Sequence, residues 1–409
     1  MDIAIIGSGM AGLASARILQ DAGHRVTIFE ALAGRGMDSH SIEFESGLID
    51  APLRVMNPKL WKNTLSLASY LGVETYPVRT FMACSWLLDG HTETWLTTSR
   101  SRIGNVPMMN NRKGLQQYGW RLAKGMLQLK SALKQFFQSK NQDITLAEFI
   151  NHYPIEAVFW HGTVMPVLYT ICTCQPKTIG QWPAKPLLEF IQQLTAGEAL
   201  LRMKGGTPAL VNRLIAGITI YSGSAVEKVE QHAEQVLVQN TQGQSGYFDR
   251  VVIATPTPVI EKFLQQPQFS DDLALLNKFR FEQGDLVIHT DPQVMPQRPK
   301  DWAVLSYMMD RSFSRQQFTV WLNAIEPSLV GKSAVFQTWC PVMSLDPTKI
   351  IAQVRLTRAV VDSDTVALNK QIQQRHLQPN RKVFYCGSWS CDGLPILESA
   401  VTSAMHIAE

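Results

Sequence analysis

Three glycines and one glutamate near the start of the chain have the spacing of a dinucleotide-binding turn. Gly7, Gly9 and Gly12 form a G-x-G-x-x-G pattern, and Glu30 follows 18 residues after the last of them. Such a turn lets the backbone approach a pyrophosphate, and the helix that follows offers unpaired N–H groups to its negative charge. A carboxylate at this spacing accepts hydrogen bonds from ribose hydroxyls. The predicted chemistry is therefore the binding of a dinucleotide.

The residues around these glycines can hold such a turn in place. An apolar run, IAII, precedes the turn, a helical pattern, LASARILQDAG, follows it until Gly23, and RVTIFE forms a second strand that ends at Glu30. Strand, turn, helix, strand and acid occur in the order that a Rossmann-type α/β fold requires. NAD and FAD share this pattern, so the choice between them depends on the rest of the chain.

Three further stretches resemble the flavin-containing amine oxidase and phytoene desaturase superfamily. The first, ALAGRGMDSHS, follows Glu30 and contains Gly34, Arg35 and Gly36. It is similar to the superfamily's Gly-Gly-Arg-like turn against the FAD diphosphate, but Arg35 separates the glycines and Met37 stands at the usual arginine position. We expect Arg35 to contact a phosphate or the ribose, with an ordinary surface arginine as the alternative.

The second stretch is DRVVIATPTPVIEKF, residues 249–263. Its apolar strand runs into Ala254 and Thr255 and resembles the segment that returns to the dinucleotide-binding sheet. The runs SAVEKVEQH and EQVLVQN before it predict paired strands. The resemblance implies that backbone near Val226 pairs with the adenine. The alternative is an unrelated helix and meander.

The third stretch is the C-terminal VFYCGSWSCDGLPILESAVTSAMHIAE. It resembles the superfamily's closing motif, which implies that Gly387 and Ser388 lie by the flavin diphosphate and that the last helix points its N-terminus at the flavin ring. A classical NAD dehydrogenase would finish its cofactor contacts within the first domain or its immediate continuation, so two chain ends at one nucleotide favour FAD. The predicted cofactor contacts also include Met10, Ala11, Ala31, Gly36, Arg54, Ala254, Thr255 and Leu397.

A chain of 409 residues suits two intertwined domains. We predict a Rossmann-type, GR2-like FAD-binding domain with an interleaved α+β substrate domain. The predicted FAD-binding pieces are residues 1–75, 205–270 and 375–409, and the predicted substrate pieces are 76–204 and 271–374.

The resemblance implies an FAD-dependent oxidoreductase that removes hydride from a C–N or C–C bond of a small amine or of an apolar, lipid-like substrate. The alternatives are a non-catalytic FAD-binding carrier or assembly protein and an NAD-dependent reductase. No catalytic residue is assigned, because His289 and Asp291 suit a core turn at least as well as a cavity, and no lysine by the flavin is identifiable. Three tryptophans are candidate cavity walls or ordinary packing residues: Trp302, Trp339 and Trp389.

Composition excludes several other classes of partner. The net charge is +4, and no basic run is interleaved with aromatics, which argues against nucleic acid. The six cysteines include no CxxC pair and no His cluster at zinc-like spacing, so we expect neither a metal site nor a disulfide framework and favour a reducing cytoplasm. A helical stripe within residues 115–137 suits weak membrane or lipid docking, although a substrate-domain helix is the commoner explanation. This helical stripe consists of Leu115, Tyr118, Leu122, Leu129, Leu133 and Phe136.

The oligomeric state is left open.

Overall fold

A five-stranded parallel sheet places the glycine turn at the carboxyl end of its central strand. In spatial order its strands are β10 (Thr219–Tyr221), β2 (Arg25–Phe29), β1 (Asp2–Ile6), β14 (Arg250–Ile253) and β20 (Val383–Tyr385). Ligands of such sheets bind beyond the carboxyl ends of the strands. The turn after β1 therefore lies where a nucleotide is expected.

Both faces of this sheet are covered, which explains why β1 is apolar from Ile3 to Ile6. Ile3 and Ile5 belong to one core, whereas Ala4 and Ile6 belong to a second core on the opposite face, and all four are buried. The first core includes α1 (Met10–Asp21) and α12 (Leu397–Ala408). The second includes α10 (Ser270–Leu276), α11 (Thr365–His376) and an antiparallel sheet of β11 (Val226–Gln231), β12 (Val236–Asn240) and β13 (Ser245–Phe248). The predicted pairing of the first two of these strands is confirmed.

A second, eight-stranded sheet lies at the other end of the molecule, mostly antiparallel but with one parallel pair, β16 and β6. Its order is β19 (Ile350–Val360), β15 (Arg280–His289), β18 (Phe336–Trp339), β17 (Gln316–Trp321), β16 (Leu305–Met309), β6 (Met82–Leu88), β7 (His91–Ile103) and β8 (Val106–Met109). The helices beside it are α3 (Arg112–Gln138), α4 (Leu146–His152), α5 (Ala157–Phe159), α6 (Met165–Cys172), α7 (Pro176–Ile179) and α8 (Ala184–Thr195).

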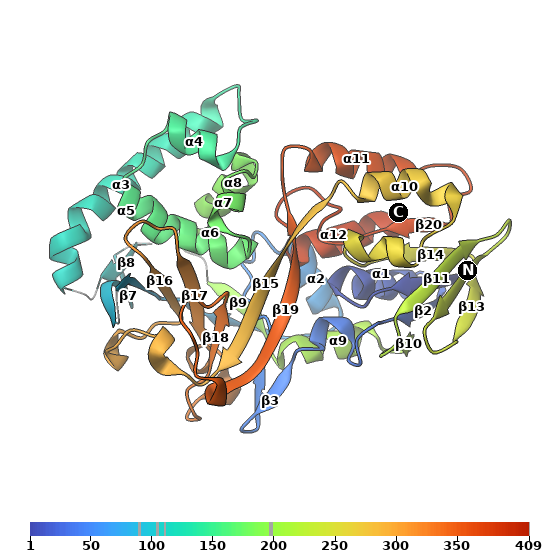
Figure 1. The fold of residues 1–409 in the computed structure, drawn as a ribbon, viewed down its shortest axis with the longest axis horizontal. Helices are drawn as coiled ribbons and strands as arrows, with labels where there is room; N and C mark the ends of the chain where they lie inside the picture. Colours follow the sequence, from blue (N-terminus) through green and yellow to red (C-terminus); the bar gives the residue numbers. More distant parts are fainter. Residues whose placement is uncertain (89–90, 104–105, 110–111, 196–198, 409) are drawn as a thin grey trace.

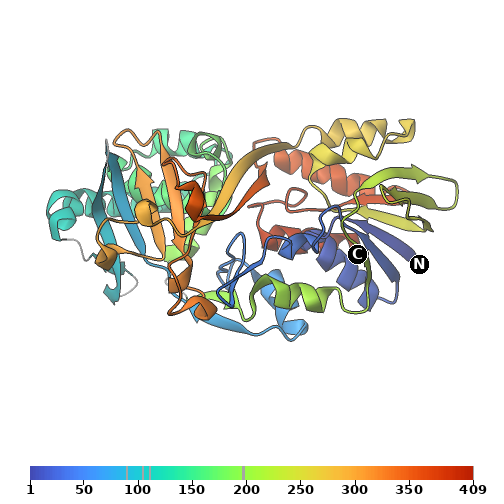
Figure 2. The same ribbon diagram turned by 60° about the horizontal axis from the view of Figure 1, so that its bottom comes forward.

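The two sheets define two lobes, which Figures 1 and 2 show side by side. We call the part around the parallel sheet the nucleotide lobe and the part around the eight-stranded sheet the cap lobe. The long antiparallel pair β15 and β19 runs between them. At the end of this pair, Phe281 and Ala359 pack against the core of the nucleotide lobe. The pair therefore couples the two lobes directly.

Shorter elements fill the space between the lobes. They are the hairpin β3 (Ile42–Phe44) and β4 (Gly47–Ile49), the pair β5 (Thr75–Val78) and β9 (Leu200–Met203), and the helices α2 (Lys62–Tyr70) and α9 (Gly206–Leu214).

This computed structural model describes residues 1–88, 91–103, 106–109, 112–195 and 199–408. It confirms the predicted fold class, an α/β nucleotide lobe with a second α+β lobe. The parallel sheet takes its strands from residues 2–29, 219–253 and 383–385. The predicted domain boundaries stay a prediction.

The helical stripe that suggested membrane docking is for the most part a core face. Tyr118, Leu129, Leu133 and Phe136 are buried in the larger core, and Leu122 packs against it, whereas Leu115 is exposed. The commoner explanation, a substrate-domain helix, thus accounts for this stripe. Among the described residues, no helix combines the length and the apolarity that crossing a membrane requires.

Candidate functional site

The glycine turn has the geometry that its spacing predicts. Gly7 adopts a positive φ of 97°, and its N–H donates to the Phe29 carbonyl at 2.8 Å. A Cβ on Gly12 would lie 1.9 Å from the Gly7 carbonyl oxygen, so only glycine lets α1 approach the strand this closely. A Cβ on Gly9 would meet no atom within 4 Å. Gly9 thus faces open space.

The start of α1 is open to an anion. Its N-cap is Gly9, which provides no side-chain cap, and its first turn contains no acidic residue. The first N–H groups of a helix lack intrahelical partners and carry a partial positive charge. Met10 and Ala11, two predicted cofactor contacts, stand in this first turn and line the cavity described below.

Glu30 is buried, with 7% of its surface exposed, and is already tied to the turn. One carboxylate oxygen accepts from the Ser8 N–H at 2.8 Å and from the Ser8 hydroxyl at 2.7 Å, and the other accepts from the Leu32 N–H at 2.8 Å. A carboxylate offers about four acceptor sites, so one remains for a ribose hydroxyl. Glu30 therefore shapes the turn as well as offering an acceptor.

Besides Gly7, Gly12 and Glu30, four predicted contacts lie outside the wall of the cavity. Arg35 pairs with Asp38 and donates to Asn212, so its guanidinium is occupied. Gly36 has a positive φ of 62° and packs on Ser8, where a Cβ would lie 2.3 Å from the serine hydroxyl. Ala31 is exposed after β2, and Val226 is buried at the start of β11.

Hydrogen bonds join the second and third resembling stretches to β1 and to each other. The Ala254 N–H donates to the Ile6 carbonyl at 2.8 Å, and the Cys386 N–H donates to Ile253 at 3.0 Å. The Trp389 indole donates to the Thr255 carbonyl at 3.1 Å. The start, the returning segment and the end of the chain therefore form one structure.

A single cavity of about 890 Å³ extends from this junction into the cap lobe. Nine predicted contacts line it: Gly9, Met10, Ala11, Arg54, Ala254, Thr255, Gly387, Ser388 and Leu397. Gly7, Gly12, Glu30, Ala31, Arg35, Gly36 and Val226 are not among its lining residues. Pro395 and Ile396 lead into the first turn of α12, so the start of that helix borders the cavity.

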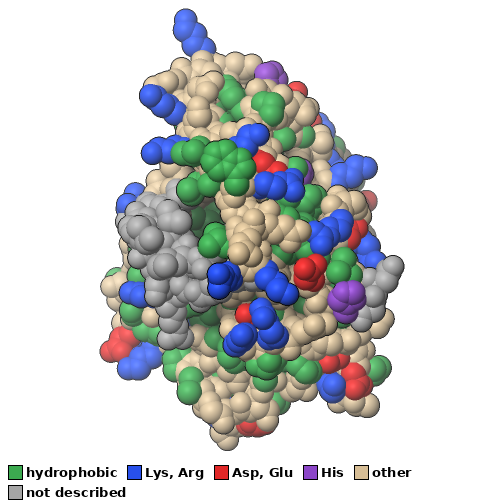
Figure 3. Space-filling model, turned by 90° about the vertical axis from the view of Figure 1, so that its left-hand side faces the viewer, with side chains coloured by type: hydrophobic (Ala, Val, Ile, Leu, Met, Phe, Trp, Pro, Cys, Tyr) green, Lys and Arg blue, Asp and Glu red, His purple; other side chains and the backbone are tan. Residues whose placement is uncertain are grey.

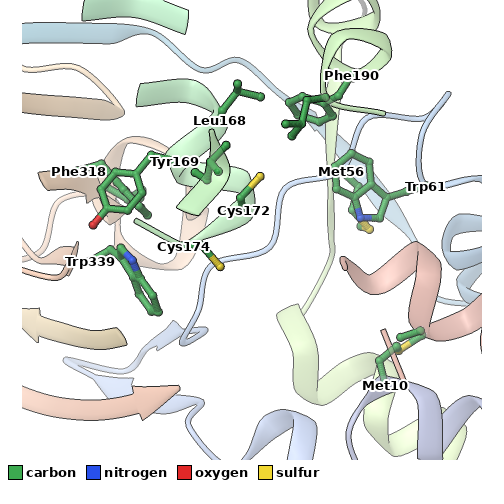
Figure 4. Packing of buried hydrophobic residues seen from close by; sticks show 14 of the residues in the cluster. Met10, Met56, Trp61, Leu168, Tyr169, Cys172, Cys174, Phe190, Phe318 and Trp339 are labelled. Atoms are coloured by element: carbon green, nitrogen blue, oxygen red, sulfur yellow. The ribbon is translucent and has the colours of Figure 1, made fainter. Parts of the chain in front are cut away.

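The cap lobe contributes an apolar wall. Aromatic residues from separate elements gather in the core around it, and Trp61, Phe190, Phe318 and Trp339 line the cavity itself (Figure 4). Trp389 is also a wall residue. Trp302 is not, because it packs with Trp321 and Phe336 in a separate cluster, where its indole donates to Pro296 at 2.8 Å.

Arginines dominate the ionisable groups of this wall. Within the described part of the chain, the lining residues include Arg54, Arg79, Arg358 and Tyr307, and no Asp, Glu, Lys or His. The Tyr307 hydroxyl lies 3.0 Å from the Thr170 hydroxyl, and burial raises its pKa. No strong base is therefore offered to a bound molecule by the described wall.

Sequence reasoning found Arg54 but not the network that holds it. Its guanidinium donates to the Pro52 carbonyl at 3.0 Å and to the Thr207 hydroxyl at 3.1 Å. Burial lowers the Arg54 pKa, and Asp50 acts in the opposite direction. Asp50 also accepts from the Thr207 N–H at the start of α9. The network ties Arg54 and Asp50 to the start of α9.

Sequence reasoning also missed Arg358. A signal was present, because QVRLTRAV alternates along β19 and places Leu356 and Arg358 on one face. Both residues line the cavity.

His289 and Asp291 do not face the cavity, and the core-turn alternative holds. His289 is fully buried; its Nε2 lies 2.8 Å from the Thr338 hydroxyl, and its Nδ1 accepts from the Asp291 N–H at 3.1 Å. Burial lowers the pKa of His289 to about 4. Burial alone would raise the pKa of Asp291. The N–H groups of Asp346 and Gln293 and the Lys349 amine instead hold that pKa below its usual value.

The buried His289 predicts a loss of stability in mild acid. Its pKa is about 4 in the fold against 6.5 for an ordinary histidine, so the unfolded chain binds the proton first. This contribution is present above pH 6.5 and is lost as the pH falls toward 4, by up to roughly 3 kcal/mol. Urea unfolding at pH 7 and pH 4.5 should show a smaller pH dependence for His289→Gln than for wild type. The exposed-site variant His232→Gln is the control, and equal slopes in all three proteins would refute the assignment.

The residues present fit a dinucleotide. The space at Gly9 is open and would be filled by any side chain at that position. The N–H groups at the start of α1 have no side-chain cap. The buried Thr255 hydroxyl, in the same cavity, has no hydrogen-bond partner.

Comparison with known proteins decides which dinucleotide. Residues 10–287 match the family described as flavin-containing amine oxidoreductase. The chain belongs to this family. Membership confirms the predicted resemblance and the predicted FAD cofactor, and it speaks against the NAD-dependent alternative.

A curated relative and two solved structures are consistent with this family. A Mycobacterium tuberculosis protein named "Putative flavin-containing monoamine oxidase AofH" is 25% identical over 274 residues, 63% of this chain and 57% of the relative. The chain thus spans less than two thirds of that relative. An Exiguobacterium protein named "Putative protoporphyrinogen oxidase" superposes with a TM-score of 0.69 at 14% identity, covering 100% of this chain and 97% of the other. Wild-type putrescine oxidase bound to putrescine superposes with a TM-score of 0.65 at 13% identity, covering 100% of this chain and 98% of the other. These likenesses show a shared fold.

Proposed function

We propose that this protein is an FAD-dependent oxidoreductase that removes hydride from an apolar substrate held in the cap lobe. One observation carries the proposal: a single cavity joins the glycine turn and the start of α12 to the aromatic wall of the cap lobe. Bound FAD would supply the hydride acceptor. The electrons would pass on to oxygen or to another acceptor.

The chain's own residues support binding, orientation and exclusion of water. Met10 and Ala11 present helix N–H groups to the diphosphate, and the start of α12 offers partial positive charge to the flavin ring. Phe318 and Trp339 form an apolar wall on the cap side. Apolar walls of this kind desolvate a bound substrate and fix its position.

Between the two substrate classes, the wall favours the apolar one. The described lining offers no carboxylate to pair with an ammonium group, while it offers many aliphatic and aromatic side chains. An amine stays the second candidate, because the family is named for amine oxidation. A non-catalytic FAD carrier is the remaining alternative.

Anaerobic flavin reduction tests the proposal. The flavin absorbance of the purified holoprotein should bleach on addition of apolar substrates, and more slowly or not at all with simple amines such as putrescine. Bleaching by amines alone would overturn the apolar assignment. If only dithionite reduces the flavin while amine and apolar panels both fail, the carrier alternative replaces the enzyme.

We further propose that α3 docks weakly on an anionic membrane, from which an apolar substrate would enter. Residues 112–140 contain seven Lys or Arg and no acidic residue. On the outward face of α3, Trp120 is 78% exposed and Leu127 is 64% exposed, beside Lys124 and Lys134. Figure 3 shows Lys and Arg side chains around hydrophobic ones on this side of the molecule. Exposed apolar residues among basic ones suit the interface of an anionic bilayer.

Vesicle sedimentation checks this docking. The holoprotein should sediment with phosphatidylcholine vesicles that contain phosphatidylserine, and not with phosphatidylcholine alone, and salt should weaken the binding. Trp120→Ser with Leu127→Ser should abolish it. Leu377→Ser is the matched control, because Leu377 is 84% exposed on the nucleotide lobe. Equal binding of the α3 variant and wild type would refute the docking surface.

We also propose that the protein is located in the cytoplasm. All six cysteines are free thiols, and four of them are buried. Free thiols are typical of a reducing compartment.

A further inference from the structure

Arg358 is a cation in the cavity wall that lacks a counter-charge. Its Nε is buried without a hydrogen-bond partner, and the side chain lines the cavity. Among the described residues, no acidic side chain forms an ion pair with it, and the groups that influence its pKa are the thiols of Cys172 and Cys174. Burying a cation without a partner costs free energy, so proteins pair such groups or use them for a ligand.

The carboxylate nearest by strand register is engaged elsewhere. Glu282 on β15 stands directly opposite Arg358 on β19. Its carboxylate accepts instead from the Gln175 N–H at 2.9 Å and from the Thr178 hydroxyl, both at α7. The side chain that could neutralise Arg358 is therefore committed to a helix of the cap lobe.

The neighbouring sulfurs do not neutralise the guanidinium. Burial raises the pKa of Cys174 to about 12 and holds that of Cys172 well above its usual value, so both are neutral thiols near pH 7. Burial also lowers the Arg358 pKa, but an arginine stays protonated near neutral pH. Arg54, which lines the same cavity, carries a like charge that adds to the positive potential.

The other arginine of this strand segment shows the contrast. Arg355 points outward and pairs with Asp285 through two hydrogen bonds of 2.8 and 3.0 Å. Arg358 lies three residues later, faces inward beside Leu356, and has no such pair in the described structure. The unpaired arginine is the one that faces the cavity.

We propose that Arg358 binds a carboxylate of the substrate, which makes the substrate an apolar acid. The planar guanidinium fork matches a carboxylate through two parallel hydrogen bonds, and an apolar wall around the pair strengthens them. Leu356 and Phe281 lie on the same wall and suit the hydrocarbon part. The inference rests on the proposed function, because it concerns the same cavity.

Ligand titration of the holoprotein tests it without turnover. Octanoate should perturb the flavin visible spectrum of wild type and bind tighter than octan-1-ol or octylamine. Arg358→Gln should weaken octanoate binding by about 10- to 100-fold and leave octan-1-ol binding unchanged. Arg358→Lys should recover part of the affinity, because it keeps the charge and loses the fork.

Two matched variants locate the effect. Arg355→Gln, on the outer face of the same strand, should bind octanoate like wild type. Arg79→Gln, at an exposed wall residue, should change the affinity by less than about threefold, which is under 1 kcal/mol. The proposal is overturned if Arg79→Gln and not Arg358→Gln abolishes binding, if octanoate and octan-1-ol bind wild type equally, or if Arg358→Gln loses FAD.

Thermal stability gives a second readout that separates ligand binding from a structural role. Removing an unpaired, half-buried cation should leave the Tm of Arg358→Met equal to or above that of wild type without ligand. Octanoate should raise the Tm of wild type and not of the variant. A strongly lowered Tm for Arg358→Met would assign Arg358 a structural role. Failure of the whole substrate panel to reduce flavin, with octanoate binding intact, would overturn the oxidoreductase and leave the carboxylate site standing.

Discussion

Gly9→Val is expected to give a folded protein that retains about a tenth or less of the wild-type flavin. A Cβ on Gly9 would meet no protein atom within 4 Å, so we expect the fold to accept the substitution. The same side chain enters the cavity where the backbone must approach the diphosphate. The measurement is the FAD released per protein chain on denaturation, together with far-UV circular dichroism.

Two comparison variants make this result specific. Thr145→Val removes the N-cap of α4, remote from the cavity, and should cost some stability without loss of flavin. Gly12→Ala should fail differently, because its Cβ would lie 1.9 Å from the Gly7 carbonyl oxygen and must separate α1 from the sheet. Normal flavin content in folded Gly9→Val would contradict the site.

Arg202→Met is expected to lower the free energy of unfolding by about 3 to 5 kcal/mol. Arg202 is 1% exposed and pairs with Glu326 of the cap lobe at 2.6 Å and with Asp50 at 3.7 Å. It also donates to the Tyr76 hydroxyl at 3.0 Å. Losing the guanidinium leaves two buried carboxylates without their cation. Urea unfolding at pH 7 measures the change.

A double-mutant cycle with Glu326→Gln isolates the pair. The double variant should be less destabilised than the two single changes added together, because the first change already leaves the carboxylate unpaired. The control is Lys204→Met, two residues after Arg202, which breaks the ion pair between Lys204 and Glu74. Both members of that pair are exposed, so we expect little change in the free energy of unfolding. A similarly small effect of Arg202→Met would show that the buried network does not stabilise the fold.

The nucleotide side of the site could be predicted because its chemistry is local in sequence. Gly7, Gly9 and Gly12 act within one turn, and each has a steric reason that spacing alone reveals. The meeting of both chain ends followed from a resemblance, and the 3.6 Å contact between the Ser15 hydroxyl and the Cys386 thiol gives it a physical basis. The assignments of the individual contacts stay predictions.

The substrate side could not be predicted because its residues meet only through tertiary packing. His289 and Asp291 share a sequence pattern with acid-base pairs, but burial and the Thr338 hydroxyl make the histidine a core residue. The stripe on α3 had the periodicity of a docking face, yet it packs inward. Arg358 is unpaired because the carboxylate of Glu282, its neighbour across the strands, binds α7 instead. No local sequence pattern predicts this tertiary contact.

The central claim is that one FAD molecule lies between the first turn of α1 and the start of α12. A crystal structure of the purified holoprotein tests it most directly. We expect density for the diphosphate beside Met10 and Ala11 and for the flavin ring beside Leu397. A structure of flavin-replete protein with this cavity empty, or with the flavin bound elsewhere, would contradict the assignment.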